Sequence, residues 1–325
     1  MLETFLNCLI RVLISLAFII PGFVLCKFKK ASANHLSTLS TVLIYVCSPC
    51  MVIYAFFSAA SNAEKYNLNK LDMGLKMLYF GLVTFVLQVL FVLVLYLILR
   101  RKFDDAKYRL LTCSSALGNV GFFGLPLVQA VVPNNPMVAC YSSVYVMSMN
   151  ILAFTVAVFC LTKEKKYISL KAAFINPTAI AILIAIPIFI FANYLNVNSF
   201  TNEAWEAVNL LGKMTTPLCM IILGIRLGVT DLKKLFARPF VYLISFLKMV
   251  AFPLFCFFIV YFIPFFDNTF KAAILILSSV PCASVILNLA EMHHSEEEIA
   301  ANCVLISTLL CFITIPLISL FLNIL

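Results

Sequence analysis

Ten apolar runs, each long enough to cross a lipid bilayer as a helix, divide almost the whole chain. No polar stretch between them is long enough to fold as a second domain. With 63% hydrophobic and 11% charged residues, the chain has more apolar surface than a water-soluble domain can bury, which predicts an all-α integral membrane protein. The runs cover residues 5–26, 36–60, 73–99, 108–132, 136–161, 172–195, 203–227, 236–263, 270–291 and 297–323.

Two of these runs are interrupted at membrane depth. Residues 114–126 and 278–288 each begin with a pair of serines and then carry helix-breaking glycine or proline. A broken helix frees backbone N–H and C=O groups that lipid cannot satisfy, so the break must face protein or a water-filled cavity. Breaks at corresponding positions of two halves point to a transporter's substrate site, so the chain is predicted to move a solute.

The distribution of Lys and Arg predicts how the runs are oriented. With the N-terminus outside, 16 basic residues fall on the cytoplasmic side and four outside. Both termini are therefore expected on the non-cytoplasmic side of the membrane. The cytoplasmic set is Lys27, Lys29, Lys30, Arg100, Arg101, Lys102, Lys107, Arg109, Lys163, Lys165, Lys166, Lys171, Arg226, Lys233, Lys234 and Arg238; the outer set is Lys65, Lys70, Lys76 and Lys271.

The two halves of the chain also repeat each other. The stretch around Pro49 in the second run matches the stretch around Pro217 in the seventh at a spacing of 168 residues, and the serine pairs of the broken runs match at 164. Chance similarity between apolar segments is the alternative. A repeat of five helices is odd, so the halves would insert in opposite orientations. Their broken helices would then meet near the midplane, where half-helix N-termini present N–H groups that suit an anion.

The residues 119–127, read as Asn-Val-Gly-Phe-Phe-Gly-Leu-Pro-Leu, resemble a motif of the auxin efflux carrier family. Pro281 in the second break, and Lys248 followed by Pro253, are similar to that family too. The family includes plant auxin carriers and bacterial permeases assigned to malate and malonate, and the resemblance covers essentially residues 1–325 as one transporter unit. The chain departs from the plant carriers in having no acid between positions 36 and 61.

The resemblance implies a fold related to the bile-acid sodium symporters, with ten transmembrane helices in two inverted five-helix repeats. Helices 4 and 9 would be broken and cross at their prolines, with the substrate beside the crossing. A scaffold part would come from residues 1–60 and 170–228, and a transport part from residues 72–162 and 235–325. The resemblance further implies elevator movement and a homodimer formed through the scaffold.

The substrate-binding candidates are grouped around the two breaks. By motif position, the resemblance assigns substrate contact to Asn119; its amide can bind a carboxylate, or can merely cap a half-helix. The neighbouring glycines can permit an unwound turn, or can merely allow close helix packing. The other candidates at the breaks are Gly118, Val120, Gly121, Pro126, Pro281, Cys282 and Ala283.

Polar side chains elsewhere in the runs supply further candidates. A lysine near mid-membrane is costly and should face the protein interior with a partner. Lys213 is expected either to contact substrate, with its repeat mate Tyr45, or to replace a bound cation; Lys248 is expected to tie the transport part together. Arg11 is expected to extend to the membrane surface. Asn150 and Asn302 are cavity candidates, and Asn288 is a candidate for structure or ion coupling, as are Pro49 and Pro217.

Several other functions are disfavoured. No nucleotide-binding loop and no nucleophile–base set is present, so neither an enzyme nor an ATP-driven pump is expected, and no cofactor is implied. The formal charge of +9 is better explained by cytoplasmic loops than by nucleic acid. His293 and His294 beside three glutamates suggest a metal site, but helix capping by Ser295, with Glu298 completing a capping box, is the simpler prediction.

These observations predict a secondary transporter or facilitator of organic anions, auxin-like or mono- and dicarboxylates, in a bacterial cytoplasmic membrane. An inside-negative potential favours export of each anionic charge by ~2.3 kcal/mol per 100 mV, so no coupling ion is needed. A sodium- or proton-coupled carboxylate importer is the alternative within transport. A membrane sensor that binds its ligand without moving it is the alternative from another class.

Overall fold

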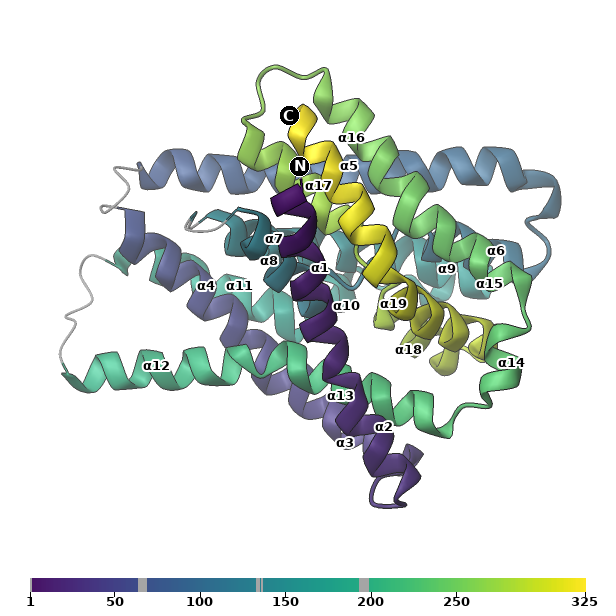
Figure 1. The fold of residues 1–325 in the computed structure, drawn as a ribbon. Helices are drawn as coiled ribbons and strands as arrows, with labels where there is room; N and C mark the ends of the chain where they lie inside the picture. The colour runs from purple at the N-terminus through teal and green to yellow at the C-terminus, as the bar shows by residue number, and fades with distance from the viewer. Residues whose placement is uncertain (1, 64–68, 133–134, 136, 193–198) are drawn as a thin grey trace.

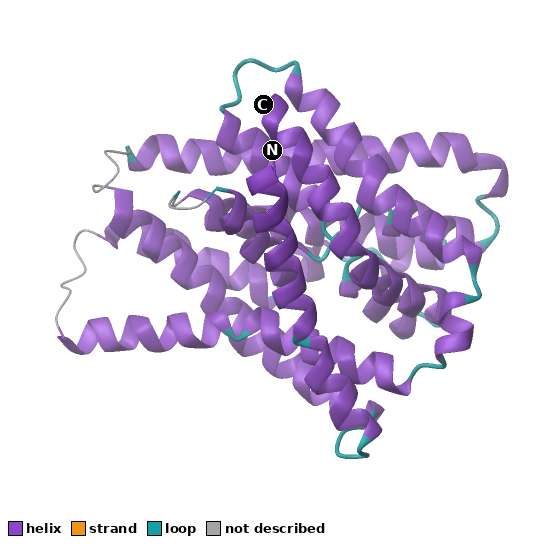
Figure 2. Ribbon diagram, in the orientation of Figure 1, coloured by secondary structure: helices purple, strands orange, loops and turns teal. Residues whose placement is uncertain are grey.

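The computed structural model describes residues 2–63, 69–132, 135, 137–192 and 199–325. Throughout these residues the fold is all-helical, with no strand and a single isolated backbone bridge (Figure 2). Eight stretches within them are long and apolar enough to cross a membrane, which confirms a multi-pass membrane protein. The eight are 5–27, 33–63, 70–102, 137–162, 165–191, 201–229, 239–261 and 297–324.

Most of the eight stretches are made of two helices in series, and three of them include a π-helical turn. In chain order the helices are α1 (Leu2–Ala17) and α2 (Ile19–Lys27); α3 (Ala33–Val42), η1 (Leu43–Cys47) and α4 (Ser48–Ala63); α5 (Lys70–Leu99); α8 (Met137–Leu152), η4 (Ala153–Ala157) and α9 (Val158–Thr162); α10 (Leu170–Phe174) and α11 (Pro177–Phe191); α12 (Ser199–Lys213) and α13 (Thr215–Val229); α15 (Pro239–Phe246), η7 (Leu247–Ala251) and α16 (Phe252–Tyr261); and α19 (Glu297–Ser319). The short helix α14 (Leu232–Phe236) joins α13 to α15.

The other two predicted runs are not continuous helices. The run 108–132 folds as α6 (Ala106–Ser114), an extended segment, the π-helical turn η3 (Val120–Gly124) and α7 (Leu125–Val131). The run 270–291 folds as α17 (Asn268–Ser278), an extended segment and α18 (Ser284–Met292). Each half is too short to span a bilayer alone, because an α-helix rises about 1.5 Å per residue. The predicted interruptions are therefore real breaks in the backbone.

One group of helices is held together by glycines at very close crossings. A Cβ atom on Gly22 of α2 would lie 2.1 Å from the Ile221 carbonyl oxygen of α13, and one on Gly224 would lie 2.1 Å from the Ile19 oxygen. Gly212 of α12 approaches the backbone of Met51 in α4 in a similar way. Such contacts let helix backbones pack directly without a side chain between them. Helices α2, α3 and α13 lie together at the bottom of Figure 1.

A second group contains both broken runs. Helix α5 packs against α8, α17 packs against α8 and α16, and α15 packs against α19. The ring of Phe80 in α5 stacks on Tyr141 of α8 with centroids 4.3 Å apart and meets Phe270 of α17 edge-on. Aromatic pairs of this kind add directional contact to ordinary apolar packing. The result ties α5, α8 and α17 into one packed unit.

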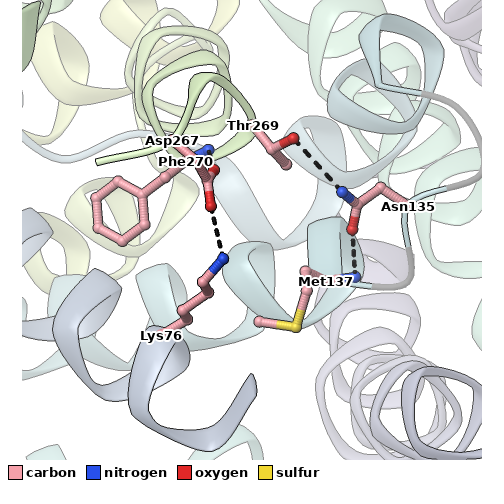
Figure 3. A network of polar contacts seen from close by, with 6 residues as sticks. All are labelled: Lys76, Asn135, Met137, Asp267, Thr269 and Phe270. Atoms are coloured by element: carbon pink, nitrogen blue, oxygen red, sulfur yellow. Dashed lines mark hydrogen bonds and ion pairs between the residues drawn. The ribbon is translucent and has the colours of Figure 1, made fainter. Parts of the chain in front are cut away.

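Polar contacts close one end of this unit (Figure 3). Asp267 accepts a hydrogen bond from the Phe270 N–H, which caps the start of α17, and also pairs with Lys76 of α5 at 2.7 Å. Asn135 donates to the Thr269 hydroxyl at 3.5 Å and accepts from the Met137 N–H, which begins α8. These contacts join the beginning of α17 to α5 and to the beginning of α8.

The predicted cap of the last helix is wrong. Helix α19 begins at Glu297, and Glu296, in the left-handed region at φ 54°, precedes it without a side-chain cap. The Ser295 hydroxyl donates instead to the Leu161 carbonyl oxygen at the end of α9, at 2.9 Å. Glu298 pairs with Arg238 at 2.6 Å rather than completing a capping box. Ser295 and Glu298 therefore interact with distant segments instead of with the first turn of α19.

Candidate functional site

The two broken runs cross at their extended segments. Gly118 and Cys282 form an antiparallel backbone bridge. The Asn119 N–H donates to the Pro281 carbonyl oxygen at 2.8 Å, and the Ala283 N–H donates to the Leu117 carbonyl oxygen at 3.1 Å. Each break thus satisfies backbone groups of the other, as backbone at membrane depth requires.

Residues outside the two segments complete the crossing. The Cys282 N–H donates to the Ser307 hydroxyl of α19 at 3.0 Å. Gly118 is a close-approach position, because a Cβ there would lie 2.8 Å from both Lys248 Cε and Val280 Cγ2. Sequence reasoning missed Ser307, since a serine in an apolar helix has no local signal that distinguishes a tertiary donor from a back-bonded hydroxyl.

The expectation that both runs cross at a proline is right for only one of them. Pro281 lies in the crossing, but the first run crosses at 117–119, and Pro126 lies in the first turn of α7. The second half-helix begins with η3 at Val120, so Pro126 lies where the π-helical turn passes into α7. The break itself falls at Gly118 and Asn119.

Two half-helices begin beside the crossing. Asn119 precedes η3 and α7, and Ala283 precedes α18, each without a side-chain cap. The first N–H groups of a helix lack acceptors within the helix and carry partial positive charge. The Asn119 side chain does not cap its helix. Its amide nitrogen instead makes a long contact of 3.9 Å with Cys219 Sγ of α13.

These half-helix starts line an inner cavity of about 430 Å³, here defined as the space bounded by η1, α4, η3, α8, α13 and α18. Gly118, Asn119, Val120, Gly121 and Ala283 all contribute to its wall. The wall is mainly apolar, with polar side chains set among the apolar ones, as is usual for a small-molecule site. The predicted candidates Tyr45, Asn150 and Asn288 also line it.

Among the polar residues of this cavity that sequence reasoning did not single out, two take part in side-chain contacts with other segments. Arg226 lies on the wall and pairs with Glu291 at 2.8 Å. Asn176 accepts a hydrogen bond from the Asn150 amide at 3.4 Å while capping α11 through the Ala179 N–H. The Asn-Pro sequence at 176–177 signals a helix start, but nothing local says that the start faces a cavity.

A separate outer cavity of about 400 Å³ is bounded by α1, α4, α7, α12 and α13. Arg11 and Lys213 both line it, together with Tyr54, Gln129 and Asn209. Pro217 lines this outer cavity as well. The structure therefore does not bring Lys213 and Asn119 into one site.

The two cavities are separated by a thin layer of protein. The Thr216 hydroxyl of α13 donates to the Phe122 carbonyl oxygen of η3 at 2.7 Å, and Thr216 faces the outer cavity while Phe122 faces the inner one. Met51 lines both cavities. A direct contact between α13 and a broken run thus stands between the two spaces.

The remaining candidates lie outside both cavities. Asn302 is buried in α19, and its amide nitrogen has no hydrogen-bond partner among the described residues. Pro49 lies in the first turn of α4. Lys248 is fully buried, with its ammonium 2.5 Å from the Ser278 carbonyl oxygen, and Cys282 is buried as well.

The charged residues that line the two cavities are all basic. Arg226 lines the inner cavity and Arg11 and Lys213 line the outer one, whereas no carboxylate is found among the described residues that line either space. The two half-helix N-termini add partial positive charge to the wall of the inner cavity, where Arg226 is paired with Glu291.

Comparison with known proteins shows which family the chain belongs to. A family model described as membrane transport protein matches residues 8–319, so the chain belongs to that family, the auxin efflux carrier family. The predicted resemblance is confirmed. The protein is a membrane transporter and not an enzyme.

Two similar relatives cover nearly the whole chain. An uncharacterized transporter of Methanothermobacter thermautotrophicus is 25% identical over 320 residues, which is 97% of this chain and 96% of the relative. An uncharacterized transporter of Methanocaldococcus jannaschii is 24% identical over 313 residues, with 94% and 96% covered. The similarity therefore extends across both broken runs.

Proposed function

We propose that this transporter carries a small organic anion, such as a mono- or dicarboxylate, by secondary or facilitated transport. The observation that carries the proposal is the convergence of two half-helix N-termini and the Asn119 amide on one cavity wall. Backbone N–H groups at such ends bind carboxylates and phosphates without further basic residues. The apolar remainder of the wall suits an organic body attached to the anionic group.

The proposed topology is ten crossings in two inverted five-helix repeats, with both termini on the non-cytoplasmic side of a bacterial cytoplasmic membrane. Ion pairs between loops support it, because each joins segments predicted on the same side. Asp104 pairs with Lys163 at 2.5 Å on the predicted cytoplasmic side, and this lowers the pKa of the Asp104 carboxyl from its ordinary value. Lys76 pairs with Asp267 on the predicted outer side.

The proposed mechanism is an elevator in which the part formed by residues 72–162 and 235–325 moves against a scaffold formed by residues 1–60 and 170–228. The glycine-mediated packing of α2 on α13 supports a rigid scaffold. The inner cavity lies between the two parts, since α13 and the broken runs both line it. We also propose a homodimer formed through the scaffold, as the family resemblance implies.

The two cavities support a path across the membrane. Arg226 and its partner Glu291 lie at the predicted cytoplasmic end of the inner cavity, so this conformation is proposed to face inward. Arg11 and Lys213 lie on the outer side of the layer made by Thr216 and Phe122. In this proposal Lys213 attracts the anion in the outer vestibule, and the Asn119 region holds it during movement.

Flux measurements on reconstituted liposomes test the proposal. A thermal-shift screen of malate, malonate, acetate and indole-3-acetate first selects a bound anion, and that anion is then used as the radiolabelled probe. We expect saturable counterflow without an added sodium or proton gradient and acceleration of export by an inside-negative potential. Uptake that requires sodium or a pH gradient would favour the coupled importer. Saturable binding without flux would favour a sensor.

A further inference from the structure

Lys248 is the feature of this fold that the proposed anion site does not use. It lies in the π-helical turn η7 between α15 and α16 and is fully buried. π-Helical turns inside α-helices often mark functional positions. Its charge also has no obvious reason to be there, because burying an ammonium inside a membrane protein is costly.

The contacts of the ammonium place it against both broken runs. Nζ donates to the carbonyl oxygen of Ser278, the last residue of α17, at 2.5 Å. A Cβ atom on Gly118, in the other broken run, would lie 2.9 Å from Nζ. The ring of Phe252 lies below, with its centroid 4.9 Å from Nζ. Lys248 therefore sits directly behind the crossing.

The one carboxylate of the two broken runs, Glu291 of α18, pairs with Arg226 and not with Lys248. Neither residues 106–163 nor residues 268–290 contain Asp or Glu, and no ion pair of Lys248 is found among the described residues. The last carbonyl groups of a helix lack donors within the helix and carry partial negative charge. The C-terminal end of α17 is thus the group that stabilises the ammonium, with the Phe252 ring as a second contact.

The crossing consequently has two electrostatic faces. The N-terminal ends of the half-helices η3–α7 and α18 line the inner cavity, whereas the C-terminal end of α17 points at Lys248. An anion on the cavity face and a cation on the opposite face are each favoured by the helix ends that they meet. A dissociable coupling cation on the face that Lys248 already occupies would be stabilised by the same C-terminal end of α17.

We propose that the Lys248 ammonium is the resident cation of the crossing and takes the place of a dissociable coupling ion. This inference rests on the proposed anion transport and deepens it. The crossing carries one fixed positive charge when empty, and binding a monoanion neutralises it. Transport of a monoanion therefore needs no sodium, and the substrate must bear at least one negative charge.

The test that needs no substrate is cation rescue of thermal stability. Purified wild-type protein is expected to unfold at the same midpoint in sodium, potassium or choline chloride at one ionic strength. Lys248→Ala removes the ammonium and leaves space, so we expect a lower midpoint that methylammonium or sodium raises in a dose-dependent way. Lys248→Met fills the space with an apolar chain, so its lowered midpoint should not respond to either cation.

Several outcomes would overturn the inference. A wild-type midpoint that rises with sodium would indicate a separate ion site. A Lys248→Met midpoint equal to that of wild type, or a Lys248→Ala midpoint that neither cation moves, would show that the positive charge is not needed. If Lys248→Ala does not fold, wild type and the charge-retaining Lys248→Arg variant still provide the test. An unfolding midpoint that sodium raises in either protein contradicts the proposal.

A separate arm distinguishes this inference from the proposed function. Counterflow of the selected anion in wild-type liposomes is measured with sodium or with choline as the main cation. Equal rates support a resident cation, and a rate that needs sodium refutes it. No flux of any carboxylate would refute the proposed function, whereas the cation-rescue result would stand independently.

Discussion

Replacing Asn119 with alanine tests the candidate anion site most directly. The backbone of Asn119 is fixed by its hydrogen bond to the Pro281 oxygen, which the substitution leaves in place. Its side chain makes no cap, and its contact with Cys219 Sγ is long at 3.9 Å. We therefore expect Asn119→Ala to fold, with a midpoint of thermal unfolding close to that of wild type.

The loss in affinity can be estimated from the one hydrogen bond that is removed. A hydrogen bond to a charged partner contributes about 1.5–3 kcal/mol. Since about 1.4 kcal/mol corresponds to a factor of ten, the Kd of the selected anion should rise about 12- to 140-fold. Asn119→Asp should abolish measurable binding, because its carboxylate lies beside the two half-helix N-termini and repels an anionic ligand there.

Titration calorimetry of purified protein with malonate, or with the anion that the screen selects, measures this change. Asn323→Ala is the matched control, because Asn323 is an exposed asparagine in η8 (Leu320–Ile324) that lines neither cavity. Its affinity should equal that of wild type. The site assignment would be refuted by a Kd of Asn119→Ala within twofold of wild type together with retained binding by Asn119→Asp.

Three further outcomes test other parts of the structure. Gly224→Leu should lower the unfolding midpoint strongly, because even a Cβ at this position meets the Ile19 oxygen at 2.1 Å; an unchanged midpoint would contradict the close crossing of α2 and α13. Lys213→Gln should slow anion flux from the outside while leaving the equilibrium Kd at the inner cavity nearly unchanged; a large rise in that Kd would instead place Lys213 in the main site. A reporter fused after Lys165 should be cytoplasmic and one at the C-terminus should be outside; two reporters on the same side would overturn the ten-crossing topology.

The sequence was sufficient to predict where the helices break, but not which residues make the break. The serine pairs and the glycines around Asn119 identify both interruptions, since few residues other than glycine and proline disrupt a helix in lipid. A proline has the same local appearance in a break and in the first turn of a helix, and so Pro126 was assigned to the crossing although it begins α7. Only the hydrogen bond of Asn119 to the extended segment at Pro281 distinguishes these cases.

Side-chain placement depended on contacts between distant segments. Lys213 and Asn119 both looked like midplane binding groups, yet the layer formed by Thr216 and Phe122 puts them in different cavities. Ser295 had the sequence of a helix cap, but the Leu161 carbonyl oxygen competes for its hydroxyl. Local propensity is a weak guide where a tertiary acceptor is nearby.

The arrangement of half-helices explains why one crossing can serve both charges. Helices α6 and α17 end at the crossing with carbonyl groups, while η3–α7 and α18 begin there with N–H groups. The positive and negative helix ends face different surroundings at the crossing. The N-terminal ends line the inner cavity, whereas the C-terminal end of α17 meets Lys248 on the other face. A charge held by backbone dipoles needs no acidic side chain, which is consistent with the lack of Asp and Glu in residues 106–131 and 268–290; Glu291, near the end of α18, pairs with Arg226. In the proposed function, selectivity for anions follows from the direction in which the helices are broken, and a change of substrate would require a change only in the apolar wall of the cavity.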